Sequence, residues 1–515
     1  MSRSSFLSYR SSCIYINLTI LTIIMQLKIR NIVHHLGSRD MDLQLQAAMQ
    51  LLKLSTSLDN SEASAVSSFV DMFGPQCTAQ LQGLVLDILS LLSVNNDNKV
   101  LIAAAGAIPF LVALLGPHSS SDVQKSAAYT LRGISLNNDN NKVLIASAGA
   151  IPPLVALLDP HSSADIQTAA VSALRTLSAN DGNKVLVAAA GAIPPLVELI
   201  GPNSSADIQS AAAGTLMSLS KNNDNIVLLA AAKAIPPLVA LLGPHSSADV
   251  QLAASTALGN LSTNNDNNVL LVAAGAIPRL VALLGPHSSA DDQVAALKAL
   301  VNLSTNDDNN VLLVAAGGIP PLVALLGPHS SADVQVVASK ALVNLSTNDD
   351  NNVLLVAAGA IPPLVALLGP HSSADVQVVA SKALGNLATN NDSMALLVGA
   401  ISPLVALLGH TSVKVQEAAV RTLYNISLND DNRVIIAAAG AIPLLVALLG
   451  PHSSAIVQKA ASHVLGGLSR NAENRALIDA ARAISPPGVL SGPQSSIPEP
   501  GRAKRVKLLG QSLTT

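Results

Sequence analysis

Apolar and polar positions follow a pattern that returns about every 42 residues along most of the chain. Each unit of the pattern contains an isoleucine that heads an equivalent apolar segment. These isoleucines are Ile108, Ile151, Ile193, Ile235, Ile277, Ile319, Ile361, Ile401, Ile442 and Ile484. Their successive spacings are 43, 42, 42, 42, 42, 42, 40, 41 and 42 residues. A period in this range is typical of solenoids built from helical repeats.

The unit around Ile319 shows which elements the pattern predicts. Asn310–Ala316 is a short apolar segment that we expect to be a first helix, and Gly317–Gly318 allows a sharp turn after it. Ile319–Leu326 is expected to form a second helix, because two prolines follow its first residue and proline is favoured at the start of a helix.

A longer third helix is predicted from Asp333 to Thr347 in the same unit. Its apolar residues recur with helical spacing, and they are Val334, Val337, Ala338, Ala341, Leu342 and Leu345. Ser330 and Asp333 form a Ser-x-x-Asp signature for the helix start, and Asn348–Asn351 indicates a polar turn into the next unit. No single unit can cover its own apolar stripe, so neighbouring units must stack.

The composition agrees with close packing of helices. Half of the 515 residues are hydrophobic but only 2% are aromatic and none is Trp, so Ala, Leu and Val must form the core. The formal net charge of −3 implies no general affinity for nucleic acid. The two cysteines, Cys13 and Cys77, provide neither a disulfide framework nor a cysteine metal site, and they fit a reducing compartment.

The high hydropathy raises a membrane alternative. Val353–Pro370 carries no charge and is about long enough to span a bilayer, and similar stretches recur in other units. However, each stretch has Gly-Ala-Ile-Pro-Pro or a close variant at its centre, and consecutive prolines start a helix instead of continuing one. The connections also lack the alternating Lys/Arg bias that sets membrane topology. We therefore do not expect an integral membrane protein.

The order of a short first helix, a Gly turn, a second helix opened by Ile-Pro and a longer third helix resembles the armadillo repeat family. The resemblance implies an all-α, right-handed superhelical solenoid of about 10–11 three-helix repeats. It is specific over residues 95–470 and weaker before them. We expect an N-terminal extension over residues 1–30, degenerate repeats over 31–94, a regular array over 95–485 and a disordered tail over 486–515.

In armadillo proteins the third helices line a concave groove, where a repeated asparagine often holds the main chain of an extended peptide. The matching positions in this sequence are Asn260, Asn302, Asn344, Asn386 and Asn425. An asparagine amide offers two donors and one acceptor group, which suits a peptide backbone. An alternative is that these side chains form hydrogen bonds inside the solenoid.

Nuclear-import adaptors of the family carry Trp one turn before each asparagine. This chain has Thr256, Lys298, Lys340, Lys382 and Arg421 at those positions. The aromatic slots for a lysine-rich import signal are therefore missing, and a basic row would attract extended acidic ligands, as in catenin-like armadillo proteins. The alternative is that these are ordinary solvated surface side chains.

No pattern of catalytic residues or cofactor-binding motif stands out, so we expect neither an enzyme nor a cofactor. Seven histidines recur in loops after Gly-Pro or Asp-Pro, and they are His118, His161, His245, His287, His329, His371 and His452. Metal binding would need their nitrogen atoms about 2 Å from one ion. Equivalent loops on stacked repeats lie about one helix spacing apart, so no metal site is expected.

The two ends differ from the array. Residues 1–39 contain no Asp or Glu and resemble a transit peptide or a short signal region, but we favour an unstructured or mis-assigned extension over either of these. The tail contains Ala-Lys-Arg-Val-Lys-Leu at 503–508, which resembles the basic nuclear import signal of the Myc transcription factor. Its basic residues are Lys504, Arg505 and Lys507. A chance basic cluster is the alternative. We expect a cytoplasmic or nuclear location, or both.

These observations favour a monomeric, non-enzymatic scaffold or adaptor that binds extended acidic segments of other proteins. An alternative is the substrate-recognition arm of a ubiquitin ligase, because plant-type ligases combine armadillo arrays with a U-box domain. A nuclear-import adaptor is a third possibility, which the missing Trp positions weaken.

Overall fold

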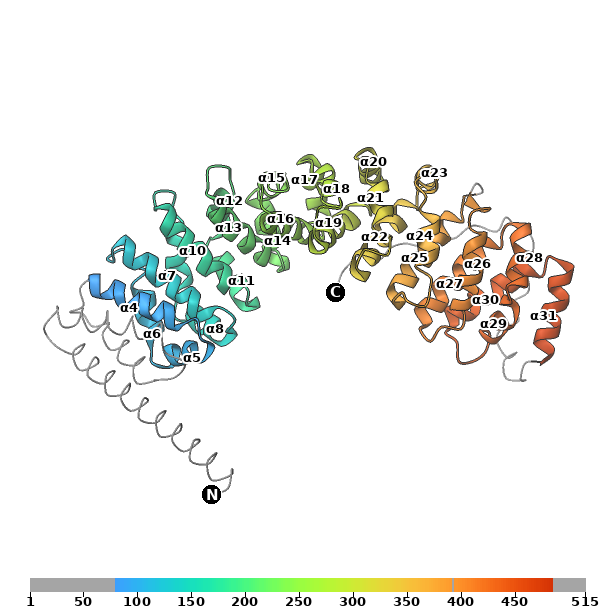
Figure 1. The fold of residues 1–515 in the computed structure, drawn as a ribbon, viewed down its shortest axis with the longest axis horizontal. Helices are drawn as coiled ribbons and strands as arrows, with labels where there is room; N and C mark the ends of the chain where they lie inside the picture. The colour runs from blue at the N-terminus through green and yellow to red at the C-terminus, as the bar shows by residue number, and fades with distance from the viewer. Residues whose placement is uncertain (1–78, 391–392, 485–515) are drawn as a thin grey trace, which may run out of the picture. The chain divides into compact units, whose positions relative to one another are not determined.

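The computed structural model describes residues 79–390 and 393–484. These residues form helices and no strand, which confirms an all-α solenoid (Figure 1). The chain divides into two compact units, one ending at Pro237 and one beginning at Leu238. The expected segments 1–30 and 486–515, and most of 31–94, lie outside the described residues.

The first unit repeats a short, a shorter and a long helix after one leading helix. Its helices are α4 (Ala79–Leu92), α5 (Asn96–Ala104), α6 (Ala107–Ala113), α7 (Ser121–Ser135), α8 (Asp139–Ser147), α9 (Ile151–Ala156), α10 (Ala164–Leu177), α11 (Asp181–Ala189), α12 (Ile193–Leu199), α13 (Ala206–Leu219) and α14 (Asn223–Ala231). The unit boundary falls inside α15 (Ile235–Ala240).

The second unit continues the same order of helices. They are α16 (Ala248–Leu261), α17 (Asn265–Ala273), α18 (Ala276–Ala282), α19 (Ala290–Leu303), α20 (Asp307–Ala315), α21 (Ile319–Ala324), α22 (Ala332–Leu345), α23 (Asp349–Ala357), α24 (Ile361–Ala366), α25 (Ala374–Leu387), α26 (Val398–Leu407), α27 (Val413–Ile426), α28 (Asp430–Ala438), α29 (Ala441–Ala447), α30 (Ala455–Leu468) and α31 (Ala472–Ile484).

The short first helices begin earlier than the apolar pattern indicated. Asn306 precedes α20 in an extended conformation, and its Oδ1 accepts the Asn309 backbone N–H at 3.1 Å. Asn348 caps α23 in the same way, so the expected polar turn at residues 348–351 is wrong. The asparagines and aspartates that looked like turn residues are helix caps and first-turn residues, where they satisfy free N–H groups and favour the helix dipole.

A residue with positive φ connects each first helix to its second helix. Gly317, with φ of 72°, turns the chain between α20 and α21 as the sequence predicted. The equivalent turn between α14 and α15 holds Lys233 with φ of 59°. A side chain in this left-handed conformation is strained, whereas glycine is not.

The third helices begin at a serine cap. Ser331 Oγ accepts the Val334 N–H at 3.3 Å, so Ser331 and not the predicted Ser330 is the cap of α22. Gln335 Nε2 then donates to the Gly327 carbonyl at 2.9 Å and fixes the turn after α21 to α22. Such a glutamine contact recurs in the other third helices, from Gln124 in α7 to Gln458 in α30.

Successive third helices pack against one another within each unit and form most of the core. On α22 the small and branched residues Ala338, Leu342 and Leu345 are buried. Burying a leucine side chain contributes about 1.5–3 kcal/mol, so the repeated Ala–Leu stripe is sufficient without aromatic residues. The third helices in the described residues are α4, α7, α10, α13, α16, α19, α22, α25, α27 and α30.

One repeat departs from the three-helix pattern. Ile361 and Ile401 are only 40 residues apart, and residues 393–397 are turns where a first helix was expected. The next helix, α26, starts early at Val398 and includes Pro403. The shortened segment therefore forms no separate first helix in its described residues 393–397, whereas the preceding and following units keep three helices.

Candidate partner-binding surface

The third helices of the second unit present three rows of side chains on one face. On α22, Asp333, Val336 and Lys340 are separated by three and then four residues, which places them one above another on successive helical turns. The corresponding residues of neighbouring helices extend each row from repeat to repeat.

We name the rows by their chemistry. The acidic row consists of four exposed residues, Asp249, Asp291, Asp333 and Asp375. The apolar row consists of four half-buried residues, Leu252, Val294, Val336 and Val378. The basic row consists of the exposed Lys298 and the half-buried Lys340, Lys382 and Arg421. The expected basic row is thus on the surface. The acidic row had not been recognised from the sequence, although a residue seven positions before each lysine gives its signal.

The side chains of the basic row are close enough to affect one another. Burial lowers the pKa of Lys340, Asp375 of the next repeat opposes that change, and Lys298 of the preceding repeat adds to it. Burial likewise lowers the pKa of Lys382, with Glu417 opposing and Arg421 and Lys340 reinforcing the change. The four basic groups therefore form one continuous electrostatic feature, with acidic groups beside it.

The row ends at α27 with a different arrangement. Arg421 Nη1 lies 3.3 Å from Glu417 Oε1 on the same helix, and Lys414 stands where α16, α19, α22 and α25 have aspartate. Lys414 also contributes to the lowered pKa of Lys382. Part of the positive charge of Arg421 is therefore already compensated within the protein.

Four of the five ladder asparagines are buried, and each lies one helical turn after a residue of the basic row. Asn302, Asn344, Asn386 and Asn425 have exposed fractions of 7%, 4%, 0% and 1%, whereas Asn260 is half-buried. Asn344 Nδ2 donates to the Val301 carbonyl at 3.1 Å and to Ser304 Oγ at 3.0 Å, both on the preceding repeat. Asn302 and Asn386 repeat this pair of bonds, and Asn425 donates to the Gly385 carbonyl at 2.8 Å.

These contacts match the second of the two interpretations that the sequence left open. Both amide protons of Asn302, Asn344 and Asn386 have acceptors inside the solenoid. A ligand main chain would have to displace one of those acceptors before the amide could donate to it. The asparagines therefore join neighbouring third helices, and the exposed chemistry lies in the three rows.

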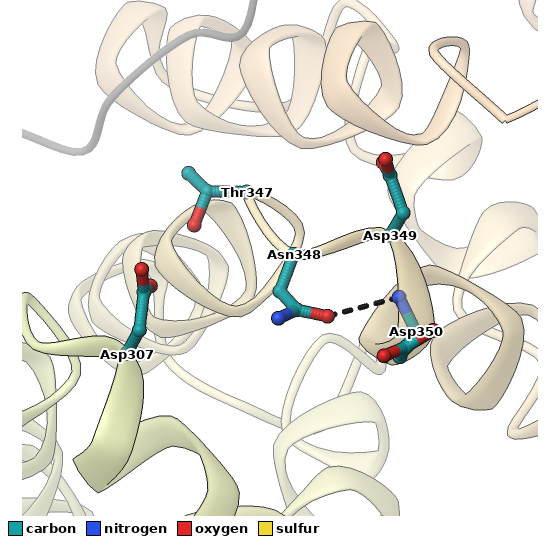
Figure 2. A pocket seen from close by; sticks show the side chains of 5 residues that line it. All are labelled: Asp307, Thr347, Asn348, Asp349 and Asp350. Atoms are coloured by element: carbon teal, nitrogen blue, oxygen red, sulfur yellow. Dashed lines mark hydrogen bonds between the residues drawn. The ribbon is translucent and has the colours of Figure 1, made fainter.

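A notch of about 380 Å³ lies on a different part of the second unit (Figure 2). Asp307 of α20 lines one side, and residues 347–350, in the turn after α22 and the first turn of α23, line the other. Asn348 Oδ1 accepts the Asp350 N–H at 2.9 Å, as Figure 2 shows. The carboxylates face solvent and do not form a metal site, because residues 79–390 and 393–484 contain no group of His, Cys, Asp or Glu able to hold an ion.

The recurring histidine loops also lack metal geometry in the described chain.

A separate apolar surface recurs on the first helices, where Val311 and Leu312 of α20 are 63% and 44% exposed. Among the described helices, none is both long and apolar enough to cross a membrane.

Comparison with known families identifies the repeat. The Armadillo/beta-catenin-like repeat matches residues 95–136, 138–179, 180–221, 222–263, 306–347, 348–389 and 394–428, which together are more than half of the chain. The chain belongs to the armadillo repeat family. The family pattern passes over residues 264–305, but α17, α18 and α19 form the same three helices there, so this armadillo array has no interruption at that point.

Solved structures support the armadillo fold. A crystal structure of an engineered protein is 29% identical, covers 79% of this chain and 99% of its own, and has a TM-score of 0.72. A structure from work on a phosphorylation switch in the cadherin–beta-catenin interaction is 18% identical, covers 87% and 94%, and has a TM-score of 0.70. No curated protein matches this chain. Armadillo arrays are typically protein-binding scaffolds without catalytic activity.

Proposed function

We propose that this armadillo array is a non-enzymatic, monomeric scaffold or adaptor that binds an extended segment of a partner protein along the three rows of the second unit. Acidic side chains of the partner would contact the basic row. The proposal rests on the basic row, in which four successive repeats each carry one basic side chain that is exposed or half-buried. These side chains are Lys298, Lys340, Lys382 and Arg421. No direct binding of nucleic acid is proposed.

Repetition is essential to this mode of binding. A single exposed ion pair contributes about 0–1 kcal/mol, so one lysine would hold a ligand only weakly. Stacked helices lie about 8–10 Å apart and an extended chain advances about 3.3 Å per residue, so a ligand meets a new repeat about every third residue. Several modest contacts then add along the same segment, and charge attraction also accelerates the encounter.

The test is a titration with a fluorescent peptide in which glutamate and serine alternate, at low and moderate salt. Lys340→Glu with Lys382→Glu should abolish measurable binding, and added salt should weaken binding to the unmodified protein. Lys221→Glu with Lys233→Glu makes the same charge change on exposed lysines outside the rows and should bind nearly as the unmodified protein does. Equal affinities for the two double variants would contradict the proposal.

The ubiquitin-ligase arm and the nuclear-import adaptor remain predictions that the described residues do not test. They differ from the scaffold in their partners: a ligase arm must co-purify with a ubiquitin-transferring subunit, and an import adaptor must bind a lysine-rich signal in preference to an acidic segment. The basic row disfavours a lysine-rich ligand through like-charge repulsion.

We also propose that the basic cluster Lys504, Arg505 and Lys507 directs the chain to the nucleus, in addition to a cytoplasmic pool. These residues lie outside the described part of the chain. Residues 485–515 fused to a large cytoplasmic reporter should move it into the nucleus, and Lys504→Ala with Arg505→Ala should reverse that. A reporter that stays cytoplasmic would reject this assignment.

A further inference from the structure

Three consecutive repeats of the second unit carry the complete set of an acid, an apolar residue and a base. The sets are Asp291, Val294 and Lys298 on α19; Asp333, Val336 and Lys340 on α22; and Asp375, Val378 and Lys382 on α25. Their charges cancel, with three aspartates against three lysines. The surface is therefore divided into two oppositely charged edges and is not a uniformly basic patch.

The two charged edges lie close enough to act on the same ligand. Seven residues of helix separate the acid and the base in each set, which corresponds to about 10 Å along the helix axis. Charges at that separation still interact at moderate ionic strength, since the screening length is also about 10 Å at 0.1 M. An acidic segment attracted to the basic row is consequently repelled by the acidic row.

Contacts between repeats show that the acidic row faces the neighbouring third helix. In the first unit Asp165 of α10, the equivalent of Asp375, lies 3.5 Å from Lys125 of α7. In the second unit Asp375 raises the pKa of Lys340 against the larger effect of burial. The aspartates therefore lie beside the path that a ligand would follow across the helices.

We infer that the partner segment is amphoteric: its alternate side chains are acidic on the edge facing Lys298, Lys340 and Lys382, and basic on the edge facing Asp291, Asp333 and Asp375. The main chain lies over the half-buried valines between them. Alternate side chains of an extended segment point to opposite sides, so one strand presents both charges at once. The inference rests on the proposed function, because it requires that the segment bind across these rows.

Three labelled peptides of equal length separate the possibilities. In the first, glutamate and lysine alternate, which places all glutamates on one edge of an extended chain. The second has the same composition arranged as a glutamate block followed by a lysine block. The third alternates glutamate with serine. We expect the alternating Glu–Lys peptide to bind at least about fivefold more tightly than either other peptide, since it adds several ion pairs without adding repulsion.

Variants assign the effect to the two edges. Asp333→Asn with Asp375→Asn should weaken binding of the Glu–Lys peptide by about fivefold and should strengthen binding of the Glu–Ser peptide. The matched control is Asp308→Asn with Asp350→Asn, which removes two exposed aspartates from the first turns of α20 and α23, away from the rows. This control carries the same loss of charge and of helix-dipole stabilisation, and it should leave both affinities unchanged.

The outcomes are distinguishable. If the Glu–Ser peptide binds as tightly as the Glu–Lys peptide and the Asp333/Asp375 variant changes neither, the amphoteric inference is wrong while the proposed function stands. If the block peptide binds as tightly as the alternating one, edge recognition is wrong. If none of the peptides binds to the folded protein at low salt, the proposed function itself fails.

Discussion

Asn344 donates its side-chain amide to the Val301 carbonyl of the preceding third helix at 3.1 Å. Val301 is an α-helical residue, and this bond ties its carbonyl to the next repeat. Asn302 and Asn386 form the same type of bond with the third helix of the repeat before each of them. The polar ladder of this array is therefore a set of connections between repeats, and it lies one helical turn beyond the basic row.

Asn344→Ala should destabilise the second unit by about 1–3 kcal/mol, the range for losing a buried hydrogen-bonding group. Asn260→Ala should cost less, because Asn260 is half-buried and Asn344 is only 4% exposed. Amide hydrogen exchange in α19 and α22 would report the loss locally. A folded Asn344→Ala protein with unchanged protection but impaired peptide binding would instead favour the main-chain clamp.

Much of the fold was predictable because its signals are local and repeated. The 42-residue period, the Gly turn at Gly317 and the helical spacing around Leu342 each follow from chain geometry alone. Helix starts were less predictable, since Asn306 and Ser331 resemble turn residues until their caps are seen. The sequence also could not decide between a ligand and Val301 as the acceptor of Asn344, because that choice depends on how neighbouring repeats face each other.

Lys233→Gly should stabilise the first unit by about 1 kcal/mol. Lys233 has φ of 59° at the position where the other repeats have glycine, and this conformation is unfavourable for any residue with a Cβ atom. Thermal unfolding of the single variant measures the gain.

The reverse substitution provides the control for that backbone effect. Gly275 has φ of 72°, and a Cβ atom added there would meet nothing within 4 Å. Gly275→Lys should therefore cost about 1 kcal/mol through backbone strain alone. A neutral result for both changes would show that this turn relaxes without strain.

Asn310→Lys, beside Asp307 in the notch, should increase the folding stability of the second unit. Asn310 is 2% exposed, and neither polar atom of its side chain has a hydrogen-bond partner among the described residues. The equivalent Lys99 donates to Asn96 Oδ1 at 2.9 Å and to the Leu136 carbonyl at 2.7 Å, and Lys142 pairs with Asp139 at 2.7 Å.

By analogy with Lys99, an ammonium at position 310 would meet the Asp307 carboxylate and the Thr347 carbonyl. Asp307 and Thr347 both line the notch, and Figure 2 shows their side chains. We expect a gain of about 1 kcal/mol from replacing unpaired buried groups with a charged hydrogen bond. Asn268→Lys is the comparison, because residue 265 is asparagine and offers no carboxylate. Equal effects at both positions in urea denaturation would show that the carboxylate of Asp307 contributes nothing.

Binding of the Glu–Ser peptide should weaken as pH rises toward 10.5. Burial lowers the pKa of Lys382 below its usual value of 10.5, and Arg421, Lys340 and Lys414 reinforce the change while Glu417 opposes it. The free protein therefore loses this proton before an ordinary lysine does. A bound carboxylate favours the ammonium and raises the pKa again, so binding takes up protons in the interval between the lowered value and 10.5.

The sign for folding follows from the same shift. Between the lowered pKa of Lys382 and 10.5, the unfolded chain holds the proton more tightly than the folded chain. The contribution of Lys382 to folding stability therefore increases with pH in this range, whereas the affinity for the peptide decreases. Lys340→Arg with Lys382→Arg keeps both charges throughout, because arginine stays protonated above pH 12. The arginine variant should retain its affinity for the peptide where the unmodified protein loses it, in anisotropy titrations from pH 7 to pH 10. The same decline in both proteins would mean that groups other than Lys340 and Lys382 control binding.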